Sequence, residues 1–194
     1  MGERILDVDL ENLHRVPRAC LEAVFWERPD PARGVDPRLE KREWFAATLL
    51  EWGPCAKLVL LDEEGVAFAQ FAPATLFPTL RRFPAASAAS PDAVYLAYCF
   101  ADEHHRGRGL GGRLIGEVAR HLVERGYRAV EALGDRAGES AWVLPFGFLA
   151  ASGFLVARDD ERFPLLRLDL LEAGRPSAHR SARSTPGSVP PAAD

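Results

Sequence analysis

Residues 101–114, with the sequence ADEHHRGRGLGGRL, contain the side chains and backbone best suited to bind an anionic ligand. The glycines at positions 107, 109, 111 and 112 leave backbone N–H groups unshielded. A helical pattern begins at about Gly109, and the N-terminus of a helix attracts anions through its free N–H groups and its dipole. Arg106, Arg108 and Arg113 add positive charge. The stretch therefore predicts a receptor for a phosphate or a pyrophosphate.

Glycine-rich loops also occur as simple tight turns, so the alternatives have to be weighed. A Walker A loop requires the pattern GxxxxGK[ST], but neither of the two lysines, Lys41 and Lys57, lies near this loop. A dinucleotide-binding loop requires GxGxxG near the opening strand of a βαβ unit, and here the glycines are spaced differently and lie past the middle of the chain. Both readings are disfavoured, which leaves another type of phosphate-binding loop.

The elements on either side of the loop are well marked. The apolar run VYLAYCFA at residues 94–101 predicts a central strand buried on both faces. Apolar residues at helical intervals predict a helix over residues 110–125, which Gly126 is placed to end. Residues 129–133 predict the next strand. The loop thus joins a buried strand to an amphipathic helix.

Periodicity and turn residues give the other elements. Helices are expected over residues 10–25 and 36–50, then a hairpin of strands 56–61 and 66–71. Proline and small residues predict an ordered loop or flap at 73–91, placed where it would cover a substrate site. A short helix at 145–152 and strands at 154–157 and 165–170 complete the pattern.

The loop and this order of elements resemble the GNAT family of N-acetyltransferases, whose signature [RQ]xxGxG/A appears here as Arg106-Gly-Arg-Gly-Leu-Gly111. Gly153-Phe154 resembles the family's Gly-Phe pair before the penultimate strand. The chain also resembles a group of actinobacterial members with a VEALGD-like fifth strand, seen at residues 130–135. The resemblance implies an α/β (α+β) fold with a central mixed, mostly antiparallel sheet flanked by helices.

By this resemblance the chain is an acetyl-CoA-dependent N-acetyltransferase without a metal, acting on a primary amine of a small molecule or a protein. The backbone amides of residues 108–112 would hold the CoA pyrophosphate, and the backbone of residues 99–101 would pair with the pantetheine arm. The cofactor-binding residues expected on this basis are Cys99, Phe100, Ala101, Arg106, Gly107, Arg108, Gly109, Leu110, Gly111 and Gly112. An amide of this set would also stabilise the oxyanion.

The catalytic residues of the family are not reproduced. The family often has an Asn after the fifth strand and a Tyr four residues before the Gly-Phe pair, and these positions hold Trp142 and Leu149. Glu131, on the fifth strand, is the first candidate for the general base, acting directly or through water, and Tyr98 is the second. Glu131 at a solvated sheet end and Tyr98 in the core are the structural alternatives. A non-catalytic acyl-CoA sensor or interaction module is therefore the second functional hypothesis.

Other residues invite functional readings with simpler alternatives. His104-His105 has no third metal ligand at a recognised spacing, so a loop role beside CoA is favoured over a metal site. Aromatic residues of the first two helices either line an acceptor pocket or fill the core: Trp26, Trp44, Phe45 and Trp52. The acidic runs at 62–64 and 159–161 are read as solvated turns.

Composition limits the remaining possibilities. The 194 residues predict one domain over residues 1–171, followed by a disordered tail rich in Pro, Ser, Ala and Arg at 172–194. A net charge of −4 disfavours nucleic-acid binding, although a third reading has the Arg-containing tail touch nucleic acid or acidic partners. No membrane span or secretory signal is expected, and three scattered cysteines indicate no disulfide framework. The chain is predicted to be cytoplasmic, bacterial, and monomeric or homodimeric.

Overall fold

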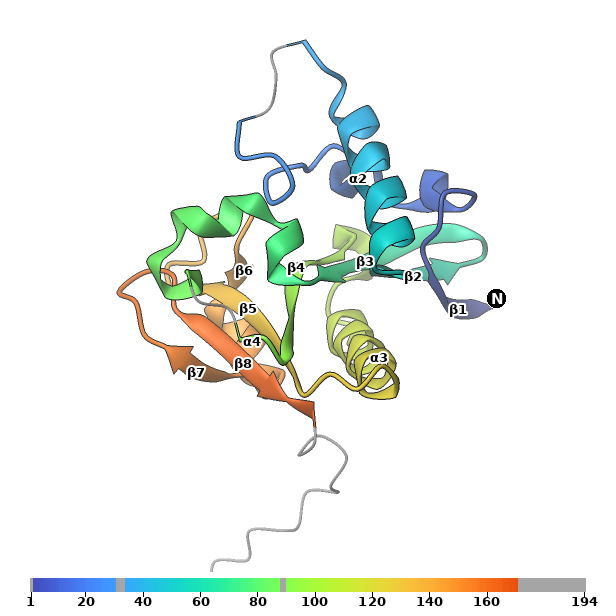
Figure 1. The fold of residues 1–194 in the computed structure, drawn as a ribbon. Helices are drawn as coiled ribbons and strands as arrows, with labels where there is room; N and C mark the ends of the chain where they lie inside the picture. Colours follow the sequence, from blue (N-terminus) through green and yellow to red (C-terminus); the bar gives the residue numbers. More distant parts are fainter. Residues whose placement is uncertain (1, 31–33, 88–89, 171–194) are drawn as a thin grey trace, which may run out of the picture.

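A single twisted sheet with helices on both faces forms the protein (Figure 1). The computed structural model describes residues 2–30, 34–87 and 90–170, so the predicted tail lies outside the described residues. The strands are β1 Glu3–Asp7, β2 Ala56–Leu61, β3 Glu64–Ala72, β4 Ala93–Ala101, β5 Ala129–Asp135, β6 Leu144–Pro145, β7 Leu155–Arg158 and β8 Leu165–Asp169. The helices are α1 Arg18–Leu21, α2 Pro37–Glu51, α3 Leu110–Glu124 and α4 Phe146–Ala151. Short 3₁₀ turns are η1 Leu13–Arg15, η2 Ala74–Leu76, η3 Pro78–Arg82, η4 Pro84–Ala86 and η5 Glu103–His105.

The strand order is β1-β2-β3-β4-β5-β8-β7, with β6 attached to the end of β5. All neighbours on the main path are antiparallel except β4 and β5, which are joined through α3 and run parallel. The mixed, mostly antiparallel sheet expected from the sequence is therefore confirmed. The parallel pair lies in the middle of the sheet, where α3 crosses from one strand to the next.

Each face of the sheet has its own core. The face toward α2 is filled by large aromatic residues, including Trp26, Phe45 and Phe77. The other face is covered by α3 and α4, which bury aliphatic residues such as Leu114, Val118 and Leu149. Alternate residues of β2 and β3 point to opposite faces, as the period of a strand requires.

Most of the elements predicted from the sequence are present. Helix α2 begins where Asp36 accepts a hydrogen bond from the Arg38 N–H at 2.9 Å, with Pro37 in the first turn. Strands β2 and β3 form the expected hairpin, and its turn residues Asp62 and Glu63 both adopt positive φ angles of 48° and 71°. Helix α3 ends before Gly126, whose φ of 81° provides the left-handed residue expected there.

The expected helix over residues 10–25 is wrong. Only the 3₁₀ turn η1 and the four-residue helix α1 occur there. Pro17 is the reason, because the residue before a proline is sterically driven out of the helical region, and Val16 is extended with ψ of 135°. The edge strand β1 was not predicted at all. Its residues are mostly exposed or half-buried, so they show no apolar signal.

A charged cluster lies inside the aromatic core. The Lys41 ammonium donates hydrogen bonds to the Glu27 carboxylate and to Gln70 Oε1, the latter at 3.2 Å. The Gln70 amide donates to the same Glu27 oxygen at 2.6 Å, and the Lys41 Nζ lies 4.6 Å from the centre of the Tyr98 ring. The side chains of Lys41 and Glu27 are each only 1% exposed. Each charge is therefore compensated by the other and by Gln70, through one oxygen of Glu27, while its Oε2 has no hydrogen-bond partner among the described residues.

Removing one partner of this pair leaves the other charge unpaired in the core. We expect Lys41→Met to lower the free energy of unfolding by about 3–5 kcal/mol. The double variant Lys41→Met with Glu27→Leu should recover most of this loss, because no buried charge is left. Urea unfolding followed by tryptophan fluorescence measures both. Equal destabilisation of the single and double variants would show that volume, and not charge, controls stability at this position.

Candidate active site

Strands β4 and β5 separate soon after they begin. Their parallel ladder joins residues 93–95 to residues 129–131 and goes no further. Beyond this point β5 continues beside β8 and ends against β6, whereas β4 continues beside β3. One edge of β4 from Leu96 to Ala101 consequently has no strand partner among the described residues. A cavity of about 590 Å³ opens in this gap.

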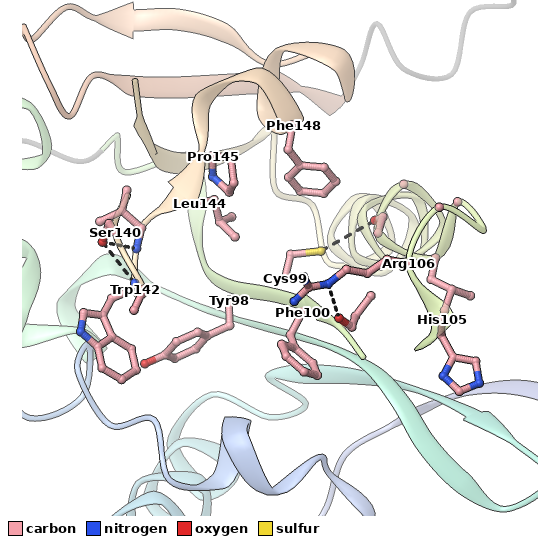
Figure 2. Close-up of a pocket in the computed structure, with 18 residues that line it drawn as sticks. Tyr98, Cys99, Phe100, His105, Arg106, Ser140, Trp142, Leu144, Pro145 and Phe148 are labelled. Carbon is pink, nitrogen blue, oxygen red and sulfur yellow. Dashed lines mark hydrogen bonds between the residues drawn. The ribbon is translucent and has the colours of Figure 1, made fainter. Parts of the chain in front are cut away.

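The cavity is enclosed by four parts of the chain (Figure 2). These are the end of β4, the loop with the first turn of α3, the segment that leads into β6, and α4. Its lining residues are Tyr98, Cys99, Phe100, Ala101, His105, Arg106, Gly107, Gly109, Leu110, Gly111, Gly112, Ser140, Ala141, Trp142, Val143, Leu144, Pro145 and Phe148.

The glycine-rich loop presents backbone N–H groups to this cavity. Gly107 and Gly109 have φ angles of 75° and 76°, which non-glycine residues rarely adopt, and Gly109 is the N-cap of α3. The Arg113 N–H donates to the Gly109 carbonyl at 3.1 Å. The N–H groups that precede it in the first turn have no possible partner within the helix. They are available for an anion at the positive end of the helix dipole.

A close contact fixes the start of α3 against α4. A Cβ atom at Gly111 would lie 2.9 Å from the Phe148 ring, a spacing that needs one of the two to move. The Cys99 thiol donates to the Gly111 carbonyl at 3.8 Å, and burial raises the pKa of this thiol to about 12. Cys99 therefore stays protonated and acts as a packing residue, and the start of α3 can lie this close to Phe148 of α4 because residue 111 is glycine.

The residues expected to hold the cofactor are brought together. All of them line the cavity except Arg108, which faces a separate hollow of about 310 Å³ beside Gly2 and Glu3. The Arg106 Nε donates to the Ala101 carbonyl at 3.2 Å, which ties the loop to the end of β4. Arg113 pairs with Glu3 on β1 and does not line the cavity.

A bulge in β4 turns Tyr98 toward the α2 side of the sheet. In the ladder with β3, Gln70 pairs with Tyr98 and Phe71 pairs with Leu96, so Ala97 is an extra residue. Ala97 and Tyr98 consequently both pack into the core on the α2 side, although neighbours in a regular strand point to opposite faces. The Tyr98 hydroxyl donates to the Ala23 carbonyl at 3.2 Å. The sequence contains no signal for this bulge.

Asp135, at the end of β5, holds the wall of the cavity opposite β4. Its buried carboxylate accepts hydrogen bonds from the N–H groups of Ala137, Glu139 and Ser140, at 3.0, 2.9 and 2.7 Å. Burial acts to raise the pKa of Asp135, but these donors, with help from Arg162, outweigh it and hold the pKa below its usual value. Asp135 thus anchors the segment that carries the lining residues 140–145.

The same segment is fixed around Trp142. The Ser140 hydroxyl oxygen accepts hydrogen bonds from the N–H groups of Trp142 and Val143, both at 3.1 Å. The Trp142 carbonyl accepts one from the Trp26 indole at 3.0 Å. Sequence reasoning did not identify Asp135 or Ser140 as parts of the site. Aspartate and serine are common acceptors of backbone N–H groups at turns, and a Gly-Asp pair at the end of an apolar run was the available signal.

The fold agrees with comparisons to known proteins. The model of the acetyltransferase (GNAT) family matches residues 21–148. The chain belongs to the GNAT family. No curated relative matches the sequence significantly.

Solved structures of GNAT proteins resemble this member in fold. YncA of Salmonella typhimurium, solved with its cofactor acetyl-CoA, has a TM-score of 0.60 at 17% identity and covers 92% of this chain and 100% of its own. An N-acetyltransferase from Staphylococcus aureus Mu50 has a TM-score of 0.57 at 18% identity, with 88% and 99% covered. PaiA N-acetyltransferase from Thermoplasma acidophilum, solved with coenzyme A, has a TM-score of 0.56 at 12% identity, with 87% and 99% covered.

The two predicted catalytic residues of this GNAT protein lie in different surroundings. Tyr98 lines the cavity, whereas Glu131 does not. Glu131 lies where β4 and β5 are still paired, opposite Tyr95, and is 2% exposed. Its carboxylate accepts hydrogen bonds from the Ser90 hydroxyl at 2.6 Å and the Ser90 N–H at 3.1 Å, and it lies 3.5 Å from Arg167. The structure thus places Glu131 in a polar network at the closed end of the strand pair.

Other predicted site residues also lie outside the cavity. Trp26 and Phe45 are buried in the core, and Trp44 and Trp52 pack against it, so none of these four lines the cavity. The 73–91 loop forms three 3₁₀ turns, and its described residues do not line the cavity either. His105 does line it, with Nδ1 3.4 Å from an Asp102 carboxylate oxygen. Within the described ranges, no three potential metal ligands cluster, and no helix is long and apolar enough to cross a membrane.

The role of Asp135 gives a prediction for stability and its pH dependence. We expect Asp135→Asn to lower the free energy of unfolding by about 2 kcal/mol at neutral pH, because backbone N–H groups lose a charged acceptor. The pKa of Asp135 is lower in the folded state, so its contribution is present above the pKa of an unfolded aspartate and is lost as pH falls through the folded value.

Urea unfolding measured from pH 7 down to pH 3 tests this expectation. The difference between wild type and Asp135→Asn should shrink as the pH falls. Glu139→Gln is the control, since its side chain is exposed and pairs only with Arg162 at 3.6 Å. A difference that stays constant over this pH range would contradict the assigned role of the Asp135 charge.

Proposed function

We propose that this chain is an acetyl-CoA-dependent N-acetyltransferase that transfers an acetyl group to a primary amine. The observation that carries the proposal is the continuous cavity that joins the N–H groups of the first turn of α3 to the unpaired edge of β4. This shape accommodates a ligand with a compact anionic group followed by an extended arm, which is the outline of an acyl-CoA. A cytoplasmic location stays part of the proposal.

In this proposal the backbone amides of residues 108–112 bind the pyrophosphate. The open edge of β4 at residues 99–101 then pairs with the amide groups of the pantetheine arm, as an added strand would. Support comes from the absence of a strand partner along this edge among the described residues and from the positive φ angles that shape the loop. The Arg106 guanidinium adds a positive charge at the same end of the cavity.

Acetyl-CoA supplies a thioester carbonyl that an amine attacks directly. A backbone N–H of β4 that points into the gap would stabilise the oxyanion, because a fixed donor there needs no reorganisation during the reaction. Of the two predicted bases, Tyr98 lines the cavity, but its hydroxyl proton is already donated to Ala23 and burial raises its pKa. Tyr98 is therefore a neutral phenol that shapes the site. Glu131 stays a prediction, and it is not among the residues that line the cavity.

A non-catalytic acyl-CoA sensor is the second candidate. It is favoured by Leu149, which replaces the tyrosine of the family pattern and is completely buried. The two candidates share cofactor binding and differ in turnover. Release of free CoA thiol from acetyl-CoA in the presence of a panel of amines would establish the transferase, whereas tight binding without turnover over the whole panel would favour the sensor.

Cofactor binding is tested by charge reversal at the start of α3. A Cβ atom at Gly112 meets nothing within 4 Å, so Gly112→Glu should fold normally and place a carboxylate beside the pyrophosphate. We expect acetyl-CoA to bind about tenfold to a hundredfold more weakly, from charge repulsion at close range. Isothermal titration calorimetry with acetyl-CoA and with CoA measures the effect.

Gly116→Glu is a matched control. Gly116 lies one turn further along α3, a Cβ there also meets nothing within 4 Å, and it does not line the cavity. The Gly116→Glu variant should bind acetyl-CoA with an affinity close to that of the wild type. The affinity of Gly112→Gln should lie between those of the two glutamate variants. If Gly112→Glu and Gly116→Glu bound acetyl-CoA with equal affinity, the pyrophosphate would not be bound by this loop.

A further inference from the structure

The two ends of the cavity differ in chemistry. Arg106 and His105 lie at the end nearest the start of α3, whereas Tyr98, Ser140 and Trp142 gather at the other end (Figure 2). If the first turn of α3 binds the pyrophosphate, an arm that follows β4 brings the thioester toward the Tyr98 and Trp142 end. The acceptor amine must therefore enter there, and the residues at that end select it.

No carboxylate lines the cavity among the described residues. Arg106 is its one permanently charged residue. Acidic side chains near the Trp142 end have partners outside the cavity: Asp135 binds backbone N–H groups, Glu139 pairs with Arg162, and one oxygen of Glu27, behind Tyr98, accepts from Lys41. A polycationic acceptor would find repulsion and no counter-charge in this site.

The acceptor end offers an aromatic surface instead. The Trp142 residue is 41% exposed, although it lines the cavity and its backbone is held by Ser140 and Trp26. The Phe25 ring stacks on the Trp142 ring with centroids 5.8 Å apart and planes within 9°. A large, fixed and partly exposed ring is well suited to bind a flat apolar group by stacking and burial. Val143 and Leu144 extend the apolar surface.

We propose that the acceptor is a primary amine carried on a flat apolar group, in the class of the arylalkylamines, and that Trp142 determines this specificity. This inference rests on the proposed function. The apolar surroundings disfavour the ammonium form of the acceptor, so the amine binds as the neutral nucleophile. The site then needs no basic side chain to deprotonate the amine before it attacks. That agrees with a cavity in which Tyr98 stays neutral and no carboxylate is present among the described lining residues.

The chemical step balances without a further reactant. The amine nitrogen forms a bond to the thioester carbonyl carbon, and the carbon–sulfur bond breaks to release the CoA thiolate. One proton leaves the nitrogen and one proton ends on the sulfur, directly or through water. The products are an N-acetylated arylalkylamine and CoA thiol.

Steady-state rates of CoA thiol release with 2-phenylethylamine, hexylamine and spermidine test the acceptor class. We expect kcat/KM to fall in that order, with phenylethylamine at least about a hundredfold above spermidine. Trp142→Ala should raise the KM for phenylethylamine about tenfold or more, the size of effect seen when a buried aromatic anchor is truncated. The KM for acetyl-CoA should change less than about twofold, and Trp142→Phe should restore most of the wild-type KM.

Ala141 provides a test by gain of function. Its side chain lines the cavity beside Trp142 and is exposed, so a slightly larger residue fits. Ala141→Asp should raise kcat/KM for spermidine about tenfold relative to the isosteric Ala141→Asn, because only the aspartate supplies a counter-charge. Equal values for these two variants would show that charge does not decide the selection.

The outcomes separate this inference from the proposed function. Turnover of spermidine above phenylethylamine, or a KM for phenylethylamine that Trp142→Ala leaves unchanged, would overturn the acceptor class while the transferase stands. Turnover of a peptide amine alone would do the same. Acetyl-CoA binding in calorimetry with no turnover of any amine would overturn both and favour the sensor.

Discussion

The separation of two parallel strands is the constraint on which the site depends. A parallel pair gains hydrogen bonds along its whole length, yet β4 and β5 share only residues 93–95 and 129–131. Beyond this ladder the end of β5 pairs with β6 at residues 134–135, while β8 pairs with the other edge of β5. On the β4 side nothing in the described chain replaces the lost ladder. A row of backbone groups is thus left for a ligand in the middle of the molecule, where a closed sheet would be a continuous core.

Neighbouring elements keep this gap open. The bulge at Ala97 changes the direction of β4 just after the last paired residue. Gly111 allows the start of α3 to contact Phe148 of α4. Helix α3 therefore lies at one end of the gap, and α4 covers it. Asp135 fixes the far wall by accepting hydrogen bonds from three backbone N–H groups of the segment that follows it. Each of these contacts is made by buried or closely packed atoms, so the walls of the cavity are held in place by the fold.

Two buried carboxylates, those of Glu27 and Glu131, are held by partners outside the cavity lining. Glu27 is neutralised by Lys41 and Gln70 behind Tyr98, and Glu131 is held by Ser90 and Arg167 below the point where the strands separate. A carboxylate that is paired and hydrogen-bonded in the core is a poor general base, because taking up a proton would break the contacts that pay for its burial. This explains how a sequence rich in acidic residues builds a cavity whose described lining has none.

The sequence predicted the parts of the molecule that are governed by local rules. Asp36 and Pro37 marked the start of α2, the apolar residues at helical intervals marked α3, and the glycine-rich loop marked one end of the cavity. The features it missed depend on contacts between distant segments. Neither the Ala97 bulge nor the early end of the β4–β5 ladder has a local signal. Glu131 looked close to the cleft because its strand borders the gap, but only the register shows that it lies below the opening.

The two departures from the family pattern have one physical consequence. At the position where the family often has a tyrosine acid, Leu149 is completely buried in the core with α3, so that position cannot reach a leaving group. At the position of the asparagine, Trp142 places a large ring at the acceptor end of the cavity. Both changes replace polar groups of the family pattern with apolar ones, one in the core and one in the cavity lining. In the proposed transfer, such a site would accelerate the reaction by positioning and by backbone hydrogen bonds to the oxyanion, and it would favour an amine that enters already neutral.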